Sequence, residues 1–320
     1  MVPDELLAEQ IDEKQPEPLY PLFASACLVT VGSFIGVLVR ESFALPLTPG
    51  STYYADLWPN FSGTFILSYL KTLVMNYAPL ITGIGTGFCG SLTTFASWML
   101  SAAQFVGPLT PDVETGPRVL LWTEVMIIIS SVSLMGWDLG KHLEFVKLCP
   151  VVPISKNADV FYFALSVTLF VVGIVAVTVI TMYRPTSFML AICWGPPGAL
   201  IRWQLGLRLN SKFPTFPIGT FIANISAAVL LAMAYVIAFS GKAGNEGTIQ
   251  CNVLAGFANG FCGSLSTVST FIGELKSLDR QHAYLYGFAS VGLAQVLMMI
   301  IIGTVTLSGT NQVIEGYCSI

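Results

Sequence analysis

Residues 87–92 read Gly-Phe-Cys-Gly-Ser-Leu, and the same six residues return at positions 260–265. Each copy is followed by two hydroxyl residues, Thr93-Thr94 in the first case and Ser266-Thr267 in the second. Self-similarity at a fixed offset, here 173 residues, indicates a repeated structural unit. This repeat decides the fold, because it predicts two related halves in one chain.

The segments that precede each copy match as well. Residues 36–40 read Gly-Val-Leu-Val-Arg, and residues 198–202 read Gly-Ala-Leu-Ile-Arg. Asn60-Phe-Ser-Gly has its counterpart in Asn224-Ile-Ser-Ala. The repeat therefore extends well beyond the glycine motif.

The composition predicts a membrane protein. Hydrophobic residues make up 54% of the 320 residues, charged residues only 10%, and the mean hydropathy is +0.74. A soluble domain carries about 25% charged residues. A helix needs about 20 apolar residues to cross a bilayer, and lipid offers the backbone no partners, so long apolar runs predict helices. Nine such runs are present, at 22–39, 57–75, 80–105, 119–139, 160–182, 188–207, 216–239, 253–272 and 283–307.

The predicted fold class is therefore an all-α integral membrane protein with nine transmembrane helices. Helices one to four repeat as helices six to nine, and the third helix of each repeat is broken. The odd fifth helix brings the second repeat in from the opposite side, which predicts inverted repeats. The expected organisation is a disordered acidic tail (1–21), a first four-helix repeat (22–140), a linker with the fifth helix (141–187), a second, inverted repeat (188–310) and a C-terminal tail (311–320). Ten of the 14 lysines and arginines fall near one face, which places the N-terminus in the cytoplasm and the C-terminus outside.

Other classes of function have little support. The net charge of −4 shows no basic patch for nucleic acid, and no glycine loop for a phosphate or an organic cofactor is present. Of the seven cysteines, four lie inside apolar segments, where cysteine is a small hydrophobe. We expect neither a disulfide framework nor a metal framework from them, and with two histidines a zinc or iron site is improbable.

On these motifs the chain resembles the Fluc (CrcB) fluoride channel family, and in particular its fused two-domain eukaryotic exporters (FEX). Bacterial members carry G-x-x-T-T-F-S-T-F in the third span and an asparagine in the second, and they assemble as antiparallel dimers. The resemblance implies a passive fluoride-selective channel, not an enzyme, that exports fluoride across the plasma membrane and confers fluoride resistance. Its partners would be fluoride and membrane lipid, and it would work as a monomer.

The family is thought to use two phenylalanines per pore, one from each antiparallel partner. The first half keeps Phe95 but has Trp98 at the second position, whereas the second half has Val268 and keeps Phe271. If each pore takes one ring from each half, Phe95 and Phe271 belong to one working pore. Val268 and Trp98 then belong to a vestigial pore.

The polar lining predicts the same asymmetry. Four residues separate Thr220 from Asn224 and Tyr286 from Ser290, so each pair lies on one helix face. These four resemble the polar track of the family, although Tyr286 alone could be an interfacial aromatic. In the first half Asp56 replaces the threonine and would repel an anion. Asn60 is either a remnant of the track or a residue that orients the break.

Glycine and hydroxyl residues in mid-membrane weaken a helix. The resemblance implies that two such breaks hold a structural sodium ion through main-chain carbonyls, which by position are those of Gly90, Thr93, Gly263 and Ser266. The alternative is that these glycines only allow close helix packing.

Arg40 and Arg202 end matching spans. We expect them either to form a vestibule charge that concentrates anions or to snorkel to the membrane interface.

No energy source is needed for export. A membrane potential of 100 mV is worth about 2.3 kcal/mol per charge, so a passive conduit expels an anion from a negative interior. Two alternatives stay open. A proton-coupled exporter of cationic drugs would use Glu124 or Asp138 as its exchange site, and a membrane-embedded enzyme would rely on His142 and His282, both expected in loops.

Overall fold

The structure is a computed structural model that describes residues 21–44, 55–73, 77–106, 115–143, 156–183, 185–240, 244–307 and 318. Every regular element within these ranges is helical, which confirms the predicted all-α class. Apart from Pro21 and Cys318, the two predicted tails, 1–21 and 311–320, lie outside the described residues.

The first half contains three continuous helices and one interrupted helix. The continuous helices are α2 (Pro21–Ala44), α3 (Leu57–Thr72) and α7 (Thr115–His142). The interrupted helix consists of α4 (Ala78–Thr82), the π-helical segment η2 (Gly83–Cys89), α5 (Gly90–Leu92) and α6 (Phe95–Val106).

The second half repeats this order. Its continuous helices are α9 (Ser187–Leu209), which runs into the short 3-10 turn η4 (Asn210–Lys212), α10 (Ile218–Phe239) and α14 (Arg280–Leu307). Its interrupted helix consists of α11 (Ile249–Gly256), the π-helical segment η5 (Phe257–Cys262), α12 (Gly263–Leu265) and α13 (Ser269–Ser277).

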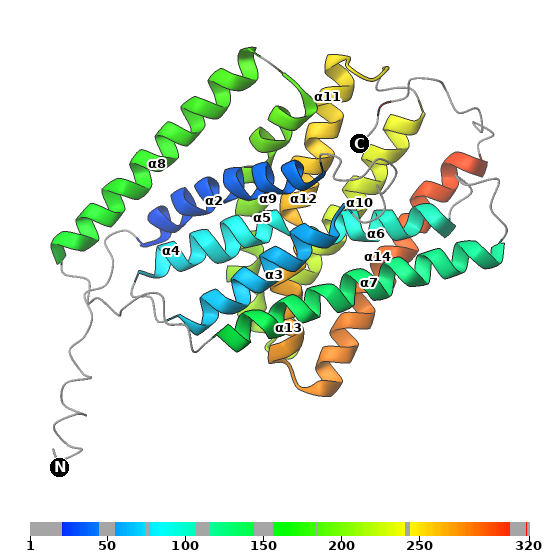
Figure 1. Cartoon of the computed structure of the whole chain (residues 1–320), viewed down its shortest axis with the longest axis horizontal. Helices are drawn as coiled ribbons and strands as arrows, with labels where there is room; N and C mark the ends of the chain where they lie inside the picture. Colours follow the sequence, from blue (N-terminus) through cyan, green and yellow to red (C-terminus); the bar gives the residue numbers. More distant parts are fainter. Residues whose placement is uncertain are drawn as a thin grey trace.

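The helix α8 (Lys156–Tyr183) stands between the halves in sequence and along the outer edge of the molecule in space (Figure 1). It packs against α2 and α9, but only 6% of its most apolar stretch is buried within the protein. It carries no polar cluster, so its surface is suited to lipid.

Both predicted interruptions are present. After Leu92 the chain is extended at Thr93 (φ −93°, ψ 144°), and after Leu265 it is extended at Ser266 (φ −87°, ψ 164°). A π-helical turn precedes each break, as is frequent near functional sites. The glycine and hydroxyl pattern therefore predicted the right places.

Five helices of the described chain are long and apolar enough to cross a bilayer: Pro21–Phe43, Gly116–His142, Val160–Tyr183, Ile218–Phe239 and Arg280–Gly303. The other four predicted spans are α3, α9 and the two interrupted helices. Helix α3 has only 16 residues, and α9 contains Pro196 and Pro197. The two interrupted helices carry the repeated glycine motif, whereas the asparagine motif lies on α3 and α10 and the arginine motif on α2 and α9.

Glycines let α2 and α9 approach the interrupted helices closely. A Cβ at Gly36 would lie 2.6 Å from the carbonyl oxygen of Phe88, and a Cβ at Gly198 would collide with that of Phe261. These contacts are equivalent in the two halves, so close packing accounts for this glycine pair.

The expectation that the cysteines form no disulfide is wrong at one pair. Cys251, near the start of α11, is bonded to Cys318 in the C-terminal region. Both are buried and pack against Ala238 at the end of α10. The sequence did not reveal this pair, because the two residues are 67 positions apart and neither forms part of a cysteine motif.

Candidate functional site

The two helix breaks meet and cap each other. The hydroxyl of Thr93 accepts hydrogen bonds from the N–H groups of Val268 (3.2 Å) and Ser269 (3.1 Å), where α13 begins. In return, the hydroxyl of Ser266 accepts from the N–H groups of Phe95 (3.2 Å) and Ala96 (3.1 Å), where α6 begins. Helix N-termini need such acceptors. Each half therefore supplies the helix cap of the other half.

Two asparagines hold the breaks from the side. Oδ1 of Asn60 accepts from the N–H of Thr94 (2.9 Å), and its Nδ2 donates to the carbonyl of the same residue (3.3 Å). Asn224 makes the matching pair with Thr267, at 2.8 and 3.2 Å. All four residues are buried, so each amide replaces helix hydrogen bonds that the break removes.

Two arginines join the halves by binding main-chain carbonyls beside the breaks. Arg40 donates to the carbonyls of Ser91 (2.6 Å) and Asn259, and Arg202 donates to those of Ser264 (2.8 Å) and Thr86 (2.9 Å). Each guanidinium thus binds one carbonyl of its own half and one of the other half. Arg40 and Arg202 are only 5% and 4% exposed, so neither side chain extends to the lipid interface as snorkelling requires. Their role as a vestibule charge stays a prediction.

The second glycine of each motif is required because an arginine of the other half packs against it. A Cβ at Gly90 would collide with the guanidinium of Arg202, and a Cβ at Gly263 would lie 2.7 Å from two guanidinium nitrogens of Arg40. These glycines leave room for a buried cation from the other half, which goes beyond the helix packing that we considered as the alternative.

The predicted pore aromatics come together. The rings of Phe95 and Phe271 lie 5.4 Å apart and edge to face, and Phe271 lies 5.3 Å from Tyr286. All three are at most 2% exposed. The row crosses from α6 of the first half to α13 and α14 of the second half, so both halves contribute to it.

A carboxylate that the sequence analysis missed joins the remaining polar residues. Glu274 Oε1 accepts from the hydroxyl of Thr220 (2.6 Å) and from Nδ2 of Asn210 (3.0 Å), and Oε2 accepts from the hydroxyl of Tyr286 (2.7 Å). The eighth span was predicted to end at residue 272, before this charge. The available signal was that Glu274 follows Phe271 by three residues, which places both on one face of α13.

Two track residues lie one helical turn farther along. Asn224 follows Thr220 on α10 and binds the break, while Ser290 follows Tyr286 on α14 and donates to its carbonyl (2.7 Å). Both are fully buried. One cluster is therefore formed by Phe95, Phe271, Tyr286, Thr220 and Glu274, with Asn224 and Ser290 at its flanks. We call it the aromatic–hydroxyl row.

The residues assigned to a vestigial pore also lie around the breaks, and Trp98 contacts the row through Phe95. Val268 is fully buried and donates its N–H to Thr93. The ring of Trp98 stands edge-on to Phe95 at 5.7 Å, and its buried indole N–H has no partner within the described residues. Asp56 is 9% exposed and precedes α3, as Thr220 stands near the start of α10. The assignment of these three residues to a vestigial pore stays a prediction.

Of the residues predicted to bind sodium, Gly90 and Gly263 begin the one-turn helices α5 and α12, and Thr93 and Ser266 follow their last residues. The last carbonyls of a helix lack intrahelical donors, and unwound backbone carbonyls are known sodium ligands. The arginines bind the neighbouring carbonyls of Ser91 and Ser264 instead of the predicted ones. The donor set therefore fits a sodium ion in kind, although two guanidinium groups lie close to Gly90 and Gly263.

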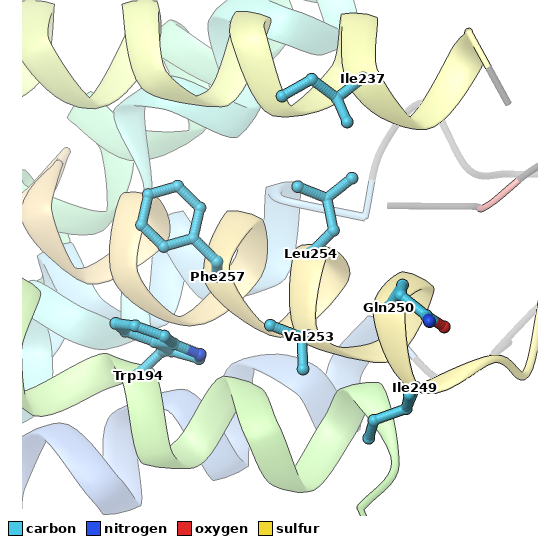
Figure 2. A pocket seen from close by; sticks show the side chains of 7 residues that line it. All are labelled: Trp194, Ile237, Ile249, Gln250, Val253, Leu254 and Phe257. Carbon is cyan, nitrogen blue, oxygen red and sulfur yellow. The ribbon is translucent and has the colours of Figure 1, made fainter. Parts of the chain in front are cut away.

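A hollow of about 530 Å³ is separate from this site. It is lined by Trp194, Ile237, Ile249, Gln250, Val253, Leu254 and Phe257. These residues come from α9, α10, α11 and η5, and Figure 2 shows the aromatic rings at one end of the hollow and Gln250 at the other. No predicted pore residue lines it, so it is not the expected conduit.

The residues of the alternative functions are poorly placed. Glu124 is exposed on α7, and Asp138 forms a salt bridge with Lys276 (2.8 Å) at a helix end. The histidines, expected in loops, lie instead in the last turn of α7 (His142) and in the first turn of α14 (His282). In these positions Glu124 and Asp138 do not form a buried exchange site, and His142 and His282 do not form a buried catalytic centre.

Fold and site together define a class: a helical membrane protein made of two related halves whose interrupted helices meet and share buried side chains. The sequence profile described as "CrcB-like protein, Camphor Resistance (CrcB)" matches residues 27–136 and 189–305. The chain belongs to this family. The family matches once in each half, as the repeat predicts.

Known proteins extend the comparison. "Fluoride export protein 1" of Candida albicans is 29% identical over 89% of this chain and 80% of its own length. "Fluoride export protein 1" of Neurospora crassa is 32% identical over 85% of this chain and 64% of its own length. "Fluoride-specific ion channel FluC" of Nitrosomonas europaea is 37% identical over 40% of this chain but 96% of its own length. No solved structure matches the chain.

Proposed function

We propose that the protein is a passive, fluoride-selective channel that exports fluoride from the cytosol. The observation that carries the proposal is the aromatic–hydroxyl row, built from both halves in a chain whose relatives are named fluoride export proteins. Fluoride is small and strongly hydrated, so a conduit must replace its water. The hydroxyl groups of Thr220 and Tyr286 donate to Glu274 in this structure and would rotate to donate to the ion instead. The ring edges of Phe95 and Phe271 carry positive partial charge.

The proposal includes one working pore and one vestigial pore within a monomer. The reciprocal caps and the paired arginines support a fused pseudo-dimer of inverted halves. Only the row that contains Phe95 and Phe271 combines two phenylalanines with the Thr220, Tyr286 and Glu274 network. The counterpart positions hold Val268 and Trp98, so we assign conduction to the first set.

The function is tested with purified protein in liposomes loaded with fluoride or chloride. A potassium ionophore sets the potential, and an ion-selective electrode measures efflux. We expect fluoride efflux without a proton gradient or nucleotide, and much slower chloride efflux. Efflux of an organic cation that needs a proton gradient and Glu124, without fluoride efflux, would favour the exporter of cationic drugs instead.

The disulfide supports the proposed orientation in the plasma membrane. Disulfides persist in oxidising compartments and are rare in the cytosol. With nine crossings and a cytoplasmic N-terminus, both Cys251 and the C-terminal region would lie outside the cell. This conclusion agrees with the distribution of lysine and arginine.

We predict that this bond is present in intact cells and can be reached from outside. An impermeant maleimide should label Cys251 and Cys318 only after treatment with an impermeant reductant, and the double variant Cys251→Ser, Cys318→Ser should abolish the label. Labelling without reduction, or only after the cells are opened, would contradict the orientation. Cys27 and Cys262 lie inside predicted spans, where an impermeant reagent does not reach them, and serve as internal controls that stay unlabelled with or without reductant.

We also propose a structural sodium ion held by the carbonyls of Gly90, Thr93, Gly263 and Ser266. It would neutralise the carbonyl ends of α5 and α12 and fasten the two breaks together. A ligand that binds only the folded state raises stability by about 2.7 kcal/mol at a concentration 100 times its dissociation constant. We therefore expect a higher unfolding temperature in sodium than in choline at equal ionic strength, and equal temperatures would exclude the site.

A further inference from the structure

A lysine of the first half lies beside the end of the aromatic–hydroxyl row. Lys71 is in the last turn of α3, and its Nζ lies 5.0 Å from the centre of the Trp137 ring. The same ring covers Gly273, where an added Cβ would lie 2.8 Å from two ring atoms and 3.4 Å from Lys71 Nζ. The ammonium is therefore held against the turn of α13 that carries Glu274.

Two other cations near this turn already have partners. Lys276 forms a salt bridge with Asp138, and the guanidinium of Arg202 binds two main-chain carbonyls. The positive charges of Lys71 and Arg202 lie close enough to Glu274 to favour its ionised form. An aromatic ring positions an ammonium without cancelling its charge. Lys71 is also exposed, so its field reaches the solvent at this end of the protein.

The need for such a charge follows from Glu274. A half-buried carboxylate hydrogen-bonded to Thr220 and Tyr286 would repel an approaching anion if nothing offset it. A cation beside it lowers that repulsion, and a positive mouth raises the local concentration of anions and their rate of entry. Because the offsetting group comes from α3, the first half would complete a mouth whose hydroxyl groups come from the second half.

We propose that Lys71, positioned by Trp137, is the anion-recruiting residue at the Glu274 end of the fluoride path. This inference rests on the proposed function. It assigns to Lys71 a part in permeation that neither the repeat nor the predicted track contains.

The test measures the initial rate of fluoride efflux from liposomes at two ionic strengths, about 10 mM and 300 mM. Steering accelerates association by about ten- to a thousandfold at low salt and fades as salt screens it. We expect Lys71→Met to slow efflux about tenfold at low ionic strength and about twofold at high ionic strength. The half-saturating fluoride concentration should rise, and the plateau rate should change little.

Three variants make the result specific. Lys71→Arg should keep the wild-type salt dependence, because it keeps the charge over the ring. Fluoride efflux through Lys71→Glu should be slower than through Lys71→Met. Lys141→Met, which removes an exposed lysine in the last turn of α7, is the matched control and should change the rate less than twofold.

Two failures are distinguishable. Wild-type protein that passes no fluoride overturns the proposed function itself. If the wild type is active but Lys71→Met matches Lys141→Met at both ionic strengths, Lys71 recruits no anions. An equal loss at both ionic strengths that arginine does not rescue assigns Lys71 a merely structural role and also overturns the proposal.

Discussion

Phe271→Ile is expected to reduce fluoride efflux by about a hundredfold or more, which corresponds to about 2.8 kcal/mol of lost ion stabilisation at about 1.4 kcal/mol per decade. The ring of Phe271 lies between those of Phe95 and Tyr286, at 5.4 and 5.3 Å. Isoleucine fills a similar volume but has no positive edge to face an anion. The measurement is efflux per protein in liposomes, with thermal unfolding as a check that the fold survives.

The matched control uses the other half. Val268 occupies the position in the second motif that Phe95 occupies in the first, and it is fully buried. Val268→Ala and Trp98→Leu should each keep most of the efflux, because neither residue belongs to the aromatic–hydroxyl row. If these two positions prove essential while Phe95 and Phe271 tolerate substitution, we have assigned conduction to the wrong pore.

Thr93→Val and Ser266→Ala are expected to abolish most efflux and also to lower the unfolding temperature. Each substitution removes an oxygen that accepts two buried N–H groups at the start of a helix from the opposite half. Loss of a helix cap costs about 1 kcal/mol, and at most about 2 kcal/mol in folded proteins. Stability should fall by about this amount, whereas conduction should fall much further because α6 and α13 carry Phe95 and Phe271.

The chain provides its own control for this prediction. One break uses threonine and the other uses serine at equivalent positions, so Thr93→Ser and Ser266→Thr keep the accepting oxygen. Both should retain efflux and stability close to the wild type. If Thr93→Val has the same efflux and unfolding temperature as Thr93→Ser, the hydroxyl does not hold the helices in place. The reciprocal capping is then not needed for conduction.

The repeated motif predicted the broken helices correctly for a local reason. Glycines and hydroxyl residues weaken a helix wherever they cluster, so the interruptions after Leu92 and Leu265 could be located without knowledge of any neighbour. The pairing of Phe95 with Phe271 was also predicted, but only because the family resemblance implied that each pore takes one ring from each half. Nothing in the spacing alone brings residues 95 and 271 together.

Other features could not be found in this way, because they depend on contacts across long distances in the chain. Glu274 was not singled out from the sequence, because only the fold places the hydroxyl groups of Thr220 and Tyr286 where they donate to it. Arg40 was equally well explained at a vestibule or an interface, whereas its guanidinium binds the carbonyls of Ser91 and Asn259.

Composition, apolar length and the internal repeat thus determined the helical membrane class, the two related halves and the positions of the breaks, since each depends on neighbours within one segment. Tertiary structure decided which hydroxyl caps which helix, where the charged groups are neutralised, and that Cys251 and Cys318 are joined. The reason is physical: hydrogen bonds, charge pairs and disulfides depend on proximity in space, and folding brings together groups that the sequence keeps far apart.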